Sequence, residues 1–371
     1  GDHRDLHLSL RRQRQMCIRD SFLSYSEYDG VITSEDMSEI SGQKLETIIR
    51  LNANENPYGT DPNVIKSLHN LQTHLYPDPN QKKIRLALSK YTGISSENLM
   101  AGAGGDEIID LLMRLFVSPG EIVIDCPPTF GMYKFSSDLS GGKIISIERD
   151  EYWNIDLEKI LQNSKTGKII FIASPNNPTG NVLDELTAKK ILDTGILLVI
   201  DETYFEFSGI SLSHLIEEYE NLVILRSFSK WAGLAGLRIG YAIGSTKIIN
   251  ILMQIKQPYN INIAAEVAAI SAINEKDNLL INVKKLIDQR IKLQNFIDTS
   301  KDKIMFFPSS ANFLLCRFRD FSGSEIYDEL SYKGIFVRKF THSSLTDCVR
   351  ISSGTSNQTD TLIDVLKNIV S

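Results

Sequence analysis

The sequence has few of the residues that build disulfide frameworks or metal sites. Its 371 residues include four cysteines, and no two of them form a CxxC pair. The six histidines form no HExxH motif, so we expect no metal site. Cysteine usage of this kind is typical of a reducing compartment, and we expect a cytoplasmic protein. Long apolar runs are also missing, since none approaches the roughly 18 residues of a membrane helix. We therefore expect no membrane partner.

The chain also lacks an excess of positive charge. It has 40 Lys and Arg residues against 46 Asp and Glu residues, a formal net charge of −6. A nucleic-acid-binding surface needs a basic excess or a basic stripe, so we expect no nucleic-acid partner. Hydrophobic residues make up 42% and charged residues 23%, which is typical of a globular protein. At about 150 residues per domain, this length predicts two domains or one large one.

The first 45 residues carry no clear periodic pattern. Residues 1–20 are rich in arginine and hold no apolar region of the kind found in secretory signals. The acidic residues Asp2, Asp5 and Asp20 disfavour a transit peptide. Residues 21–45 are polar and acidic. We expect residues 1–45 to form a flexible or non-native N-terminal segment.

From about residue 75 the pattern alternates strands with helices. Four runs are apolar on both faces and rich in Ile and Val: 121–125, 168–173, 196–200 and 222–226. Strands of a parallel sheet that is covered on both sides have this composition. Helical patterns such as 106–116 lie between them. The predicted fold class is α/β, with a mostly parallel sheet covered by helices in a large domain over 76–275.

The C-terminal third predicts a smaller α+β domain. A long helical stretch covers about 263–298. Shorter strand-like and helical patterns follow it at 311–318, 323–333, 335–340, 349–352 and 358–370. We expect residues 276–371 to join residues 46–75 in this smaller domain.

Polar residues follow the predicted strands directly. The segments after three of them are SPNNPTG at 174–180, DETY at 201–204 and SFSK at 227–230, and a glycine-rich stretch at 101–105 precedes the helix at 106–116. Ligands of open α/β sheets bind beyond the carboxyl ends of the strands. These segments are therefore expected to converge on one edge of the sheet.

Two of these residues have side chains suited to covalent cofactor chemistry. A free lysine titrates near pH 10.4, so at pH 7 almost all of it is protonated and not nucleophilic. A covalent bond to an aldehyde cofactor would overcome this limit and would also hold Lys230 in place. Asp201 ends an apolar strand, where it could cap a helix or face a pyridinium nitrogen. The glycines at 101–105 can offer backbone N–H groups to a phosphate, and Arg238 can add a bidentate contact. The glycines do not form the GxGxxG motif of dinucleotide-binding proteins, because Glu107 stands at the position of its third glycine. This disfavours an NAD-dependent dehydrogenase.

The order of these motifs makes the resemblance specific. SPNNPTG, then VIDETY, then SFSK followed by GLRIG resembles the pyridoxal 5′-phosphate (PLP)-dependent aminotransferases of fold type I. Within that class, residues 48–371 are similar to the histidinol-phosphate aminotransferases. The motifs that carry this narrower similarity are LNANENPYG at 51–59, YPDP at 76–79, CPPTFGMY at 126–133, GIFVRKF at 334–340 and VRISSGT at 349–355.

The resemblance implies roles around the cofactor ring. Lys230 would bind PLP covalently and move a proton, and Asp201 would pair with the pyridinium nitrogen. Asn177 and Tyr204 would hydrogen-bond the phenolic oxygen of the ring, and Phe130 would stack on its face. Lys230, Asp201 and Tyr204 are thus the implied catalytic residues.

The resemblance also implies sites for the phosphate and the substrates. The phosphate would be held by the backbone at Gly105, Asp106 and Glu107, by the side chains of Ser227, Ser229 and Arg238, and by Tyr76 of a neighbouring subunit. A homodimer with shared active sites follows from the last of these. The implied substrate-binding residues are Arg350, Arg338, Asn54 and Tyr58, with Arg350 and Arg338 at the anionic ends.

The implied reaction is amino transfer between L-histidinol phosphate and 2-oxoglutarate, giving imidazole acetol phosphate and glutamate in histidine biosynthesis. An aromatic amino acid aminotransferase and a threonine-phosphate decarboxylase resemble this group and remain alternatives. A binding or regulatory module without activity is a further alternative. The joint presence of Lys230, Asp201, Asn177 and Arg238 argues against it.

Overall fold

A computed structural model describes residues 30 and 32–370. All of these except Gly30 belong to one compact unit, Val31–Ser371. Most of the segment predicted to be flexible or non-native lies outside the described residues. Its described part differs from the expected loose lead-in, because it contains helix α2 (Ser34–Ser41).

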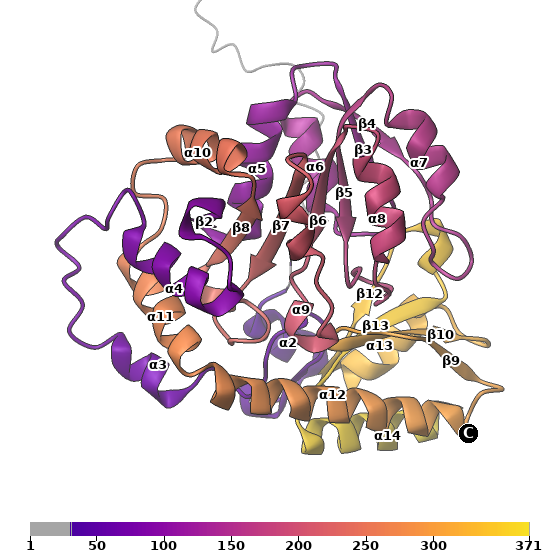
Figure 1. Ribbon diagram of the computed structural model, residues 1–371. Coiled ribbons are helices and arrows are strands. Elements are labelled where there is room, and N and C mark those ends of the chain that lie inside the picture. Colours follow the sequence, from indigo (N-terminus) through magenta and orange to yellow (C-terminus); the bar gives the residue numbers. More distant parts are fainter. Residues whose placement is uncertain (1–29, 31, 371) are drawn as a thin grey trace, which may run out of the picture. The chain divides into compact units, whose positions relative to one another are not determined.

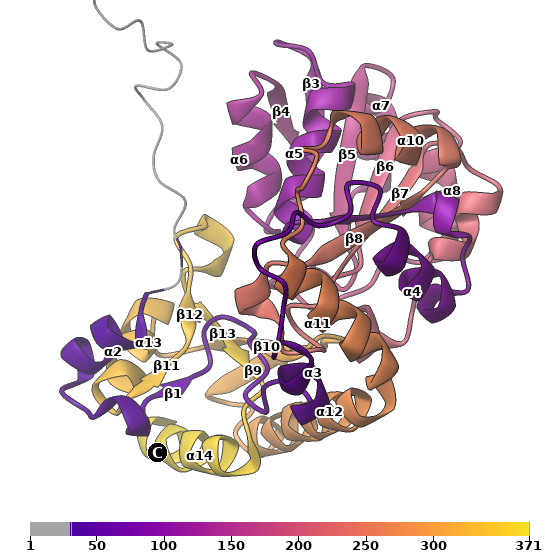
Figure 2. The ribbon, with the colours of Figure 1, turned by 90° about the vertical axis from the view of Figure 1, so that its left-hand side faces the viewer.

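Helix α2 has strong start and stop signals that the polar composition concealed. Thr33 and Asp36 form a reciprocal capping box, and Gly42 ends the helix in the left-handed conformation with φ 65°. Met37 is fully buried. Figure 2 shows α2 beside α13 (Gly323–Tyr332). One buried side chain and two caps therefore fix a helix whose mean composition is hydrophilic.

A seven-stranded sheet forms the first part of the unit (Figure 1). Its order is β2-β8-β7-β6-β5-β3-β4, and β8 alone runs in the opposite direction to the other six strands. The predicted mostly parallel α/β sheet is confirmed. The strands are β2 (Leu99–Gly102), β3 (Ile122–Asp125), β4 (Lys143–Ser146), β5 (Gly167–Ala173), β6 (Leu197–Asp201), β7 (Leu222–Ser227) and β8 (Gly240–Gly244).

Both faces of this sheet are covered, because alternate residues of each strand enter different cores. In β6, Leu197 and Val199 join one core, and Leu198 and Ile200 join the other. The first core includes α5 (Gly104–Phe116), α6 (Met132–Leu139) and α10 (Thr246–Ile255). The second core includes α3 (Pro62–Ser67), α4 (Lys82–Thr92), α7 (Leu157–Asn163), α8 (Glu185–Leu192) and α11 (Ile263–Asn274).

The C-terminal part carries a second, antiparallel sheet of order β12-β13-β10-β9. The helix predicted over 263–298 is interrupted at Glu275, where α11 ends and α12 (Lys276–Asp298) follows. The single run predicted over 335–340 is two short strands that belong to different sheets. The strands are β9 (Ile304–Phe307), β10 (Phe313–Phe318), β11 (Ile335–Phe336), β12 (Arg338–Lys339) and β13 (Cys348–Ser352), and α14 (Ser356–Val370) follows.

A parallel pair joins distant parts of the sequence. Strand β1 (Ile49–Arg50) pairs with β11, so the loop after β1 lies against the C-terminal part. The remaining helices are short: α9 (Phe205–Ser208) and the 3₁₀ turns η2 (Leu45–Thr47), η3 (Ser96–Asn98), η4 (Ser213–Glu217), η5 (Ala235–Leu237) and η6 (Ser343–Leu345).

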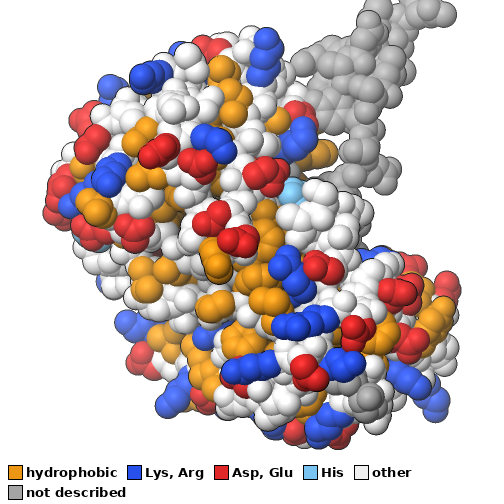
Figure 3. Space-filling model, turned by 90° about the vertical axis from the view of Figure 1, so that its right-hand side faces the viewer, with side chains coloured by type: hydrophobic (Ala, Val, Ile, Leu, Met, Phe, Trp, Pro, Cys, Tyr) orange, Lys and Arg blue, Asp and Glu red, His pale blue; other side chains and the backbone are white. Residues whose placement is uncertain are grey.

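The surface carries charges of both signs. Figure 3 shows Lys and Arg side chains interspersed with Asp and Glu on the face that it draws. Some pair within one helix, such as Lys134 with Asp138 at 2.8 Å in α6. Within residues 32–370, no helix is both long and apolar enough to cross a membrane.

Candidate active site

Lys230 lies just beyond β7, facing the loop that follows β1. Its Nζ donates a hydrogen bond of 2.8 Å to the carbonyl oxygen of Ala53. Burial and the nearby charges of Arg350 and Arg238 lower the pKa of Lys230 to about 8, against the opposing charges of acidic neighbours. About one such lysine in ten carries a neutral amine at pH 7, against about one in a few thousand for a free lysine. The surroundings of Lys230 therefore favour a nucleophilic amine.

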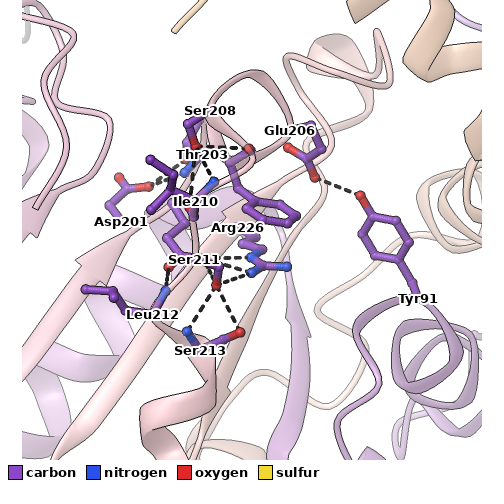
Figure 4. Close-up of polar contacts among 12 residues, drawn as sticks. Tyr91, Asp201, Thr203, Glu206, Ser208, Ile210, Ser211, Leu212, Ser213 and Arg226 are labelled. Carbon is purple, nitrogen blue, oxygen red and sulfur yellow. Dashed lines mark hydrogen bonds and ion pairs between the residues drawn. The ribbon is translucent and has the colours of Figure 1, made fainter. Parts of the chain in front are cut away.

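Asp201 is the last residue of β6 and is buried at 8% exposure. Its carboxylate accepts hydrogen bonds from the Thr203 hydroxyl at 2.7 Å and the Thr203 amide at 3.0 Å (Figure 4). It also accepts one from the Tyr133 hydroxyl at 2.8 Å. All three donors are neutral, and burial raises the pKa of Asp201. The helix-cap alternative is wrong, because α9 begins four residues later and Tyr204 stands at its N-cap. A buried carboxylate with neutral partners is suited to a cationic ligand group.

Tyr204 is held from the loop after β1. Asn54 donates a hydrogen bond of 2.8 Å from Nδ2 to the Tyr204 hydroxyl. Ser352 of β13 fixes Asn54, since its hydroxyl donates to Asn54 Oδ1 at 2.8 Å and accepts from the Asn54 amide at 2.9 Å. The Asn54 backbone has φ 54°, a left-handed conformation that asparagine tolerates better than most residues. Hydrogen bonds thus link Tyr204 to the loop after β1 and, through Asn54, to β13.

Arg350 connects the 174–180 segment to the loop after β1. Its Nη1 donates to Asn177 Oδ1 and its Nη2 to the Asn52 carbonyl, both at 2.5 Å. The side chain is buried at 7% exposure, and its guanidinium lies 5.5 Å from the ring centroid of Phe313. Arg338 is the register partner of Arg350 across β12 and β13, which places the two arginines on the same face of that sheet.

The start of α5 and Arg238 form a close, polar turn. Arg238 Nη2 lies 2.7 Å from Asp106 Oδ2 in the first turn of the helix. Gly104 has φ +81°, and a Cβ there would lie 2.8 Å from Arg238 Nη2, so the turn requires glycine. Ser227 and Ser229 are both buried, and the Ser229 amide donates to the Ser227 hydroxyl at 3.1 Å. Backbone N–H groups at a helix start, a guanidinium and hydroxyls suit a phosphate.

Two further residues of this helix start have different surroundings. A Cβ at Gly105 would meet nothing within 4 Å. The Glu107 carboxylate instead accepts hydrogen bonds from the Ala103 amide at 2.6 Å and from Asn260 Nδ2 at 2.8 Å. The side chain of Glu107 is thus used to hold the turn, which leaves its backbone as the part available to an anion.

The other three predicted aromatic residues lie in different settings. Phe130 packs edge to face on Tyr133, with ring centroids 5.6 Å apart, and so lies next to a hydrogen-bond partner of Asp201. Tyr58 is partly buried, which raises its pKa, and Lys285 Nζ lies 5.0 Å from its ring centroid. Tyr76 is 80% exposed and stacks on Tyr259 at 4.4 Å.

The structure adds partners that sequence reasoning missed. Tyr133, Thr203 and Ser352 hold Asp201 and Asn54, as described above. Thr203 could have been found, because an Asp with a Thr two residues later commonly forms a local turn. Tyr133 and Ser352 lie inside the motifs at 126–133 and 349–355, but their contacts depend on tertiary packing.

A buried ion pair supports the turn after β6. Arg226 of β7 donates to Glu202 from Nε at 3.0 Å and from Nη2 at 2.8 Å, and both residues are under 5% exposed. The Ser211 hydroxyl and the Leu212 amide donate to the same carboxylate. Because Glu202 lies between Asp201 and Thr203 in the sequence, this pair fixes the backbone that carries Asp201.

A second acid, which is half-buried, lies near this pair. Burial raises the pKa of Glu206 to about 7, and its carboxylate accepts a hydrogen bond of 3.0 Å from the Tyr91 hydroxyl (Figure 4). Arg226 also stacks over the ring of Phe205, 3.8 Å from its centroid. Polar contacts of Glu202 and Glu206 therefore support the 201–206 turn.

Comparison with known proteins shows which family the sequence matches. Residues 46–366 match the family described as aminotransferase class I and II. Histidinol-phosphate aminotransferase of Roseiflexus castenholzii is 42% identical over 95% of this chain and 98% of the relative. The chloroplastic enzyme of that name from Nicotiana tabacum is 40% identical over 95% of this chain and 86% of the relative.

A solved structure has the same fold. Histidinol-phosphate aminotransferase from Sinorhizobium meliloti, in complex with pyridoxal-5′-phosphate, superposes with a TM-score of 0.84. The match covers 95% of this chain and 98% of the other at 24% sequence identity. At this identity the similarity concerns the fold, which agrees with the fold class predicted from the sequence.

Proposed function

The chain belongs to the aminotransferase class I and II family, and on that premise we propose that it is a histidinol-phosphate aminotransferase. It transfers an amino group between L-histidinol phosphate and 2-oxoglutarate, giving imidazole acetol phosphate and glutamate in histidine biosynthesis. The observation that carries the substrate assignment is the 42% identity to the Roseiflexus castenholzii enzyme over nearly the whole chain.

The cofactor is pyridoxal 5′-phosphate, and the described residues fit it. Asp201 is buried among neutral donors and suits a cationic ring nitrogen. Lys230 has a lowered pKa and suits an aldehyde, and the glycine turn beside Arg238 suits a phosphate. When bound, the cofactor supplies an aldehyde that takes up amines and a ring that withdraws electrons from the reacting carbon.

We assign the ring contacts to five residues. Lys230 would hold the cofactor and then act as the base that takes the proton from the donor carbon and returns it. Its pKa of about 8 supports this role, because a base works best near the operating pH. Asp201 would hold the charge on the ring nitrogen. Tyr204, fixed by Asn54, and Asn177, fixed by Arg350, would hydrogen-bond the ring oxygen. Phe130, packed on Tyr133, would cover the ring face.

The phosphate would lie at the start of α5. We assign it to the backbone of Gly105, Asp106 and Glu107 and to the side chains of Ser227, Ser229 and Arg238. The contact between Arg238 and Asp106 supports this placement, since it brings the guanidinium to the first turn of the helix.

Two arginines would hold the anionic ends of the substrates. Arg350 would bind the carboxylate of glutamate, and Arg338, on the same sheet face, would assist with the phosphate of the other substrate. Asn54 and Tyr58 would close over the substrate from the loop after β1. A single pair of cations can serve two dissimilar substrates because both carry anions.

We also propose the assembly and the domain division. The exposed, stacked rings of Tyr76 and Tyr259 support a homodimer in which Tyr76 reaches the partner's cofactor phosphate. The separate sheets support a large domain over 76–275 and a small domain formed by 46–75 and 276–371. The free thiols of Cys126, Cys316 and Cys348 support a reducing, cytoplasmic location.

A substrate panel tests the function. Purified protein loaded with cofactor is given L-histidinol phosphate and 2-oxoglutarate, and glutamate is measured. We expect glutamate formation faster than with phenylalanine or tyrosine as the donor. Threonine phosphate should release no carbon dioxide. Preference for an aromatic donor, or carbon dioxide from threonine phosphate, would contradict the assignment.

A further inference from the structure

A cavity of about 280 Å³ lies beside the carboxyl end of β5, and Lys230, Arg238 and Arg350 are not part of its lining. Its lining includes the buried side chains of Ile172, Ala173 and Leu183. The exposed residues Asn154 and Asp184 also line it, so it opens to solvent on that side. The cavity thus combines an apolar interior with a polar mouth, as small-molecule sites commonly do.

The one cation in this lining is Arg149, which is buried at 9% exposure. Its Nε donates to the Cys126 carbonyl at 3.0 Å and its Nη1 to the Trp153 carbonyl at 2.9 Å. Its Nη2 has no hydrogen-bond partner among the described residues. Both partners are neutral, so Arg149 brings a buried positive charge to the wall of the cavity.

Among the described residues, two acids near Arg149 form hydrogen bonds to other groups and no ion pair with it. Asp150, whose charge acts on Arg149, accepts hydrogen bonds from the Tyr152 amide and from the amide and side chain of Asn154. Asp184 caps α8 by accepting from the Thr187 amide at 2.9 Å. A buried charge without a counter-charge is costly, and a bound anion would relieve that cost.

We propose that this cavity is a second binding site, for a small molecule that carries a carboxylate or a phosphate. A guanidinium recognises both kinds of oxyanion. The apolar residues leave room for a short carbon chain behind the anionic group, and the volume limits the ligand to metabolite size.

The site is connected to the candidate active site through hydrogen bonds. The Trp153 carbonyl that accepts from Arg149 also accepts from Asn181 Nδ2 at 2.7 Å. Asn181 accepts in turn from Thr179, and Thr179 accepts from Asn176 at 2.8 Å. Asn176 precedes Asn177, the partner of Arg350, so a ligand at Arg149 adjoins the segment that carries Asn177.

Calorimetric titration of the cofactor-loaded protein with inorganic phosphate and, separately, with succinate tests the proposal. All variants carry Arg350→Gln, which weakens anion binding at the candidate active site. Arg149→Gln removes the charge, and Val182→Phe fills the cavity while keeping Arg149. Val182 lines the cavity and has no assigned role in catalysis. Retention of the cofactor absorbance band shows that each variant is folded.

We expect the Arg350→Gln protein to bind at least one probe, and each second substitution to weaken that binding roughly tenfold or more. Binding of phosphate alone or of succinate alone supports the site and identifies the anion. Failure to bind either probe, or equal binding in all three proteins, overturns the proposal. The titration involves no turnover, so its result is independent of the proposed amino transfer.

Discussion

Asn54 donates a hydrogen bond of 2.8 Å to the hydroxyl of Tyr204, which lies 150 positions later in the sequence. The bond joins the loop after β1 to the end of β6, and Ser352 of β13 holds Asn54 from the other side. A residue assigned to the substrate thus positions a residue assigned to the cofactor. The loop and the ring contacts form one unit.

This unit should show coupled effects in a double-mutant cycle. Loss of one neutral hydrogen bond costs about 0.5–1.5 kcal/mol, so Asn54→Gly should lower kcat/KM roughly two- to tenfold. Glycine keeps the left-handed backbone that alanine would strain. Tyr204→Phe also removes the hydroxyl assigned to the ring oxygen, so it should lower kcat/KM further in the Asn54→Gly protein, but by a smaller factor than in the wild-type protein. Additive losses would show that the two residues act independently.

Asp201 should be needed for turnover more than for cofactor retention. Asp201→Asn keeps the shape of the side chain but removes the charge that we assign to the ring nitrogen. A lost charge-assisted contact of about 1.5–3 kcal/mol predicts a fall in kcat of roughly ten- to a hundredfold. Thr203→Val is the matched control, since it removes a neutral donor at the same carboxylate and should cost less. A near-normal kcat in Asp201→Asn would argue against the pairing.

The lowered pKa of Lys230 predicts a pH-dependent stability in the cofactor-free protein. The unfolded chain binds a proton at Lys230 up to about pH 10.4, whereas the folded chain releases it near pH 8. The unfolded state therefore holds more protons between these values, and stability rises with pH across this window. Lys230→Met should stabilise the protein at pH 7 and lose most of that advantage by pH 10. Urea unfolding at both pH values measures the difference, and a constant advantage would contradict the buried charge.

The Glu202–Arg226 pair should be the most sensitive polar contact beneath the site. Glu202→Gln leaves Arg226 buried without its counter-charge, which typically costs about 3–5 kcal/mol. Asp138→Asn breaks the exposed pair with Lys134 and should change the free energy of unfolding by less than about 1 kcal/mol. Denaturant unfolding compares the two variants, and similar effects would show that the buried pair is not required.

The sequence predicted the strands whose two faces are both buried. The segments 168–173 and 222–226 are apolar except for Lys168 and Arg226 at their ends, and they became β5 and β7 within one residue. Strand β8 was not predicted, because two of its five residues are glycines and its position depends on pairing with β2 and β7. Helix α2 was concealed by its polar surface, although Thr33 and Asp36 carried its capping box.

The site residues that lie at the end of a strand or just after it could be predicted from the sequence. Asp201 and Lys230 end up at the same edge of the sheet because β6 and β7 are parallel neighbours. The contact of Tyr133 with Asp201 joins positions 68 apart, and the contact of Arg350 with Asn177 joins positions 173 apart. No local pattern encodes such pairs, since they arise from how α6 and β13 pack against the sheet.

The position of the covalently held cofactor tests the account most directly. Cofactor-loaded protein is reduced with borohydride and digested, and mass spectrometry locates the lysine that carries the reduced cofactor. We expect the modification on Lys230 and its loss in Lys230→Ala, with Lys285 near Tyr58 as an internal control that stays unmodified. Modification of another lysine in the wild-type protein, with Lys230 unmodified, would contradict the central claim.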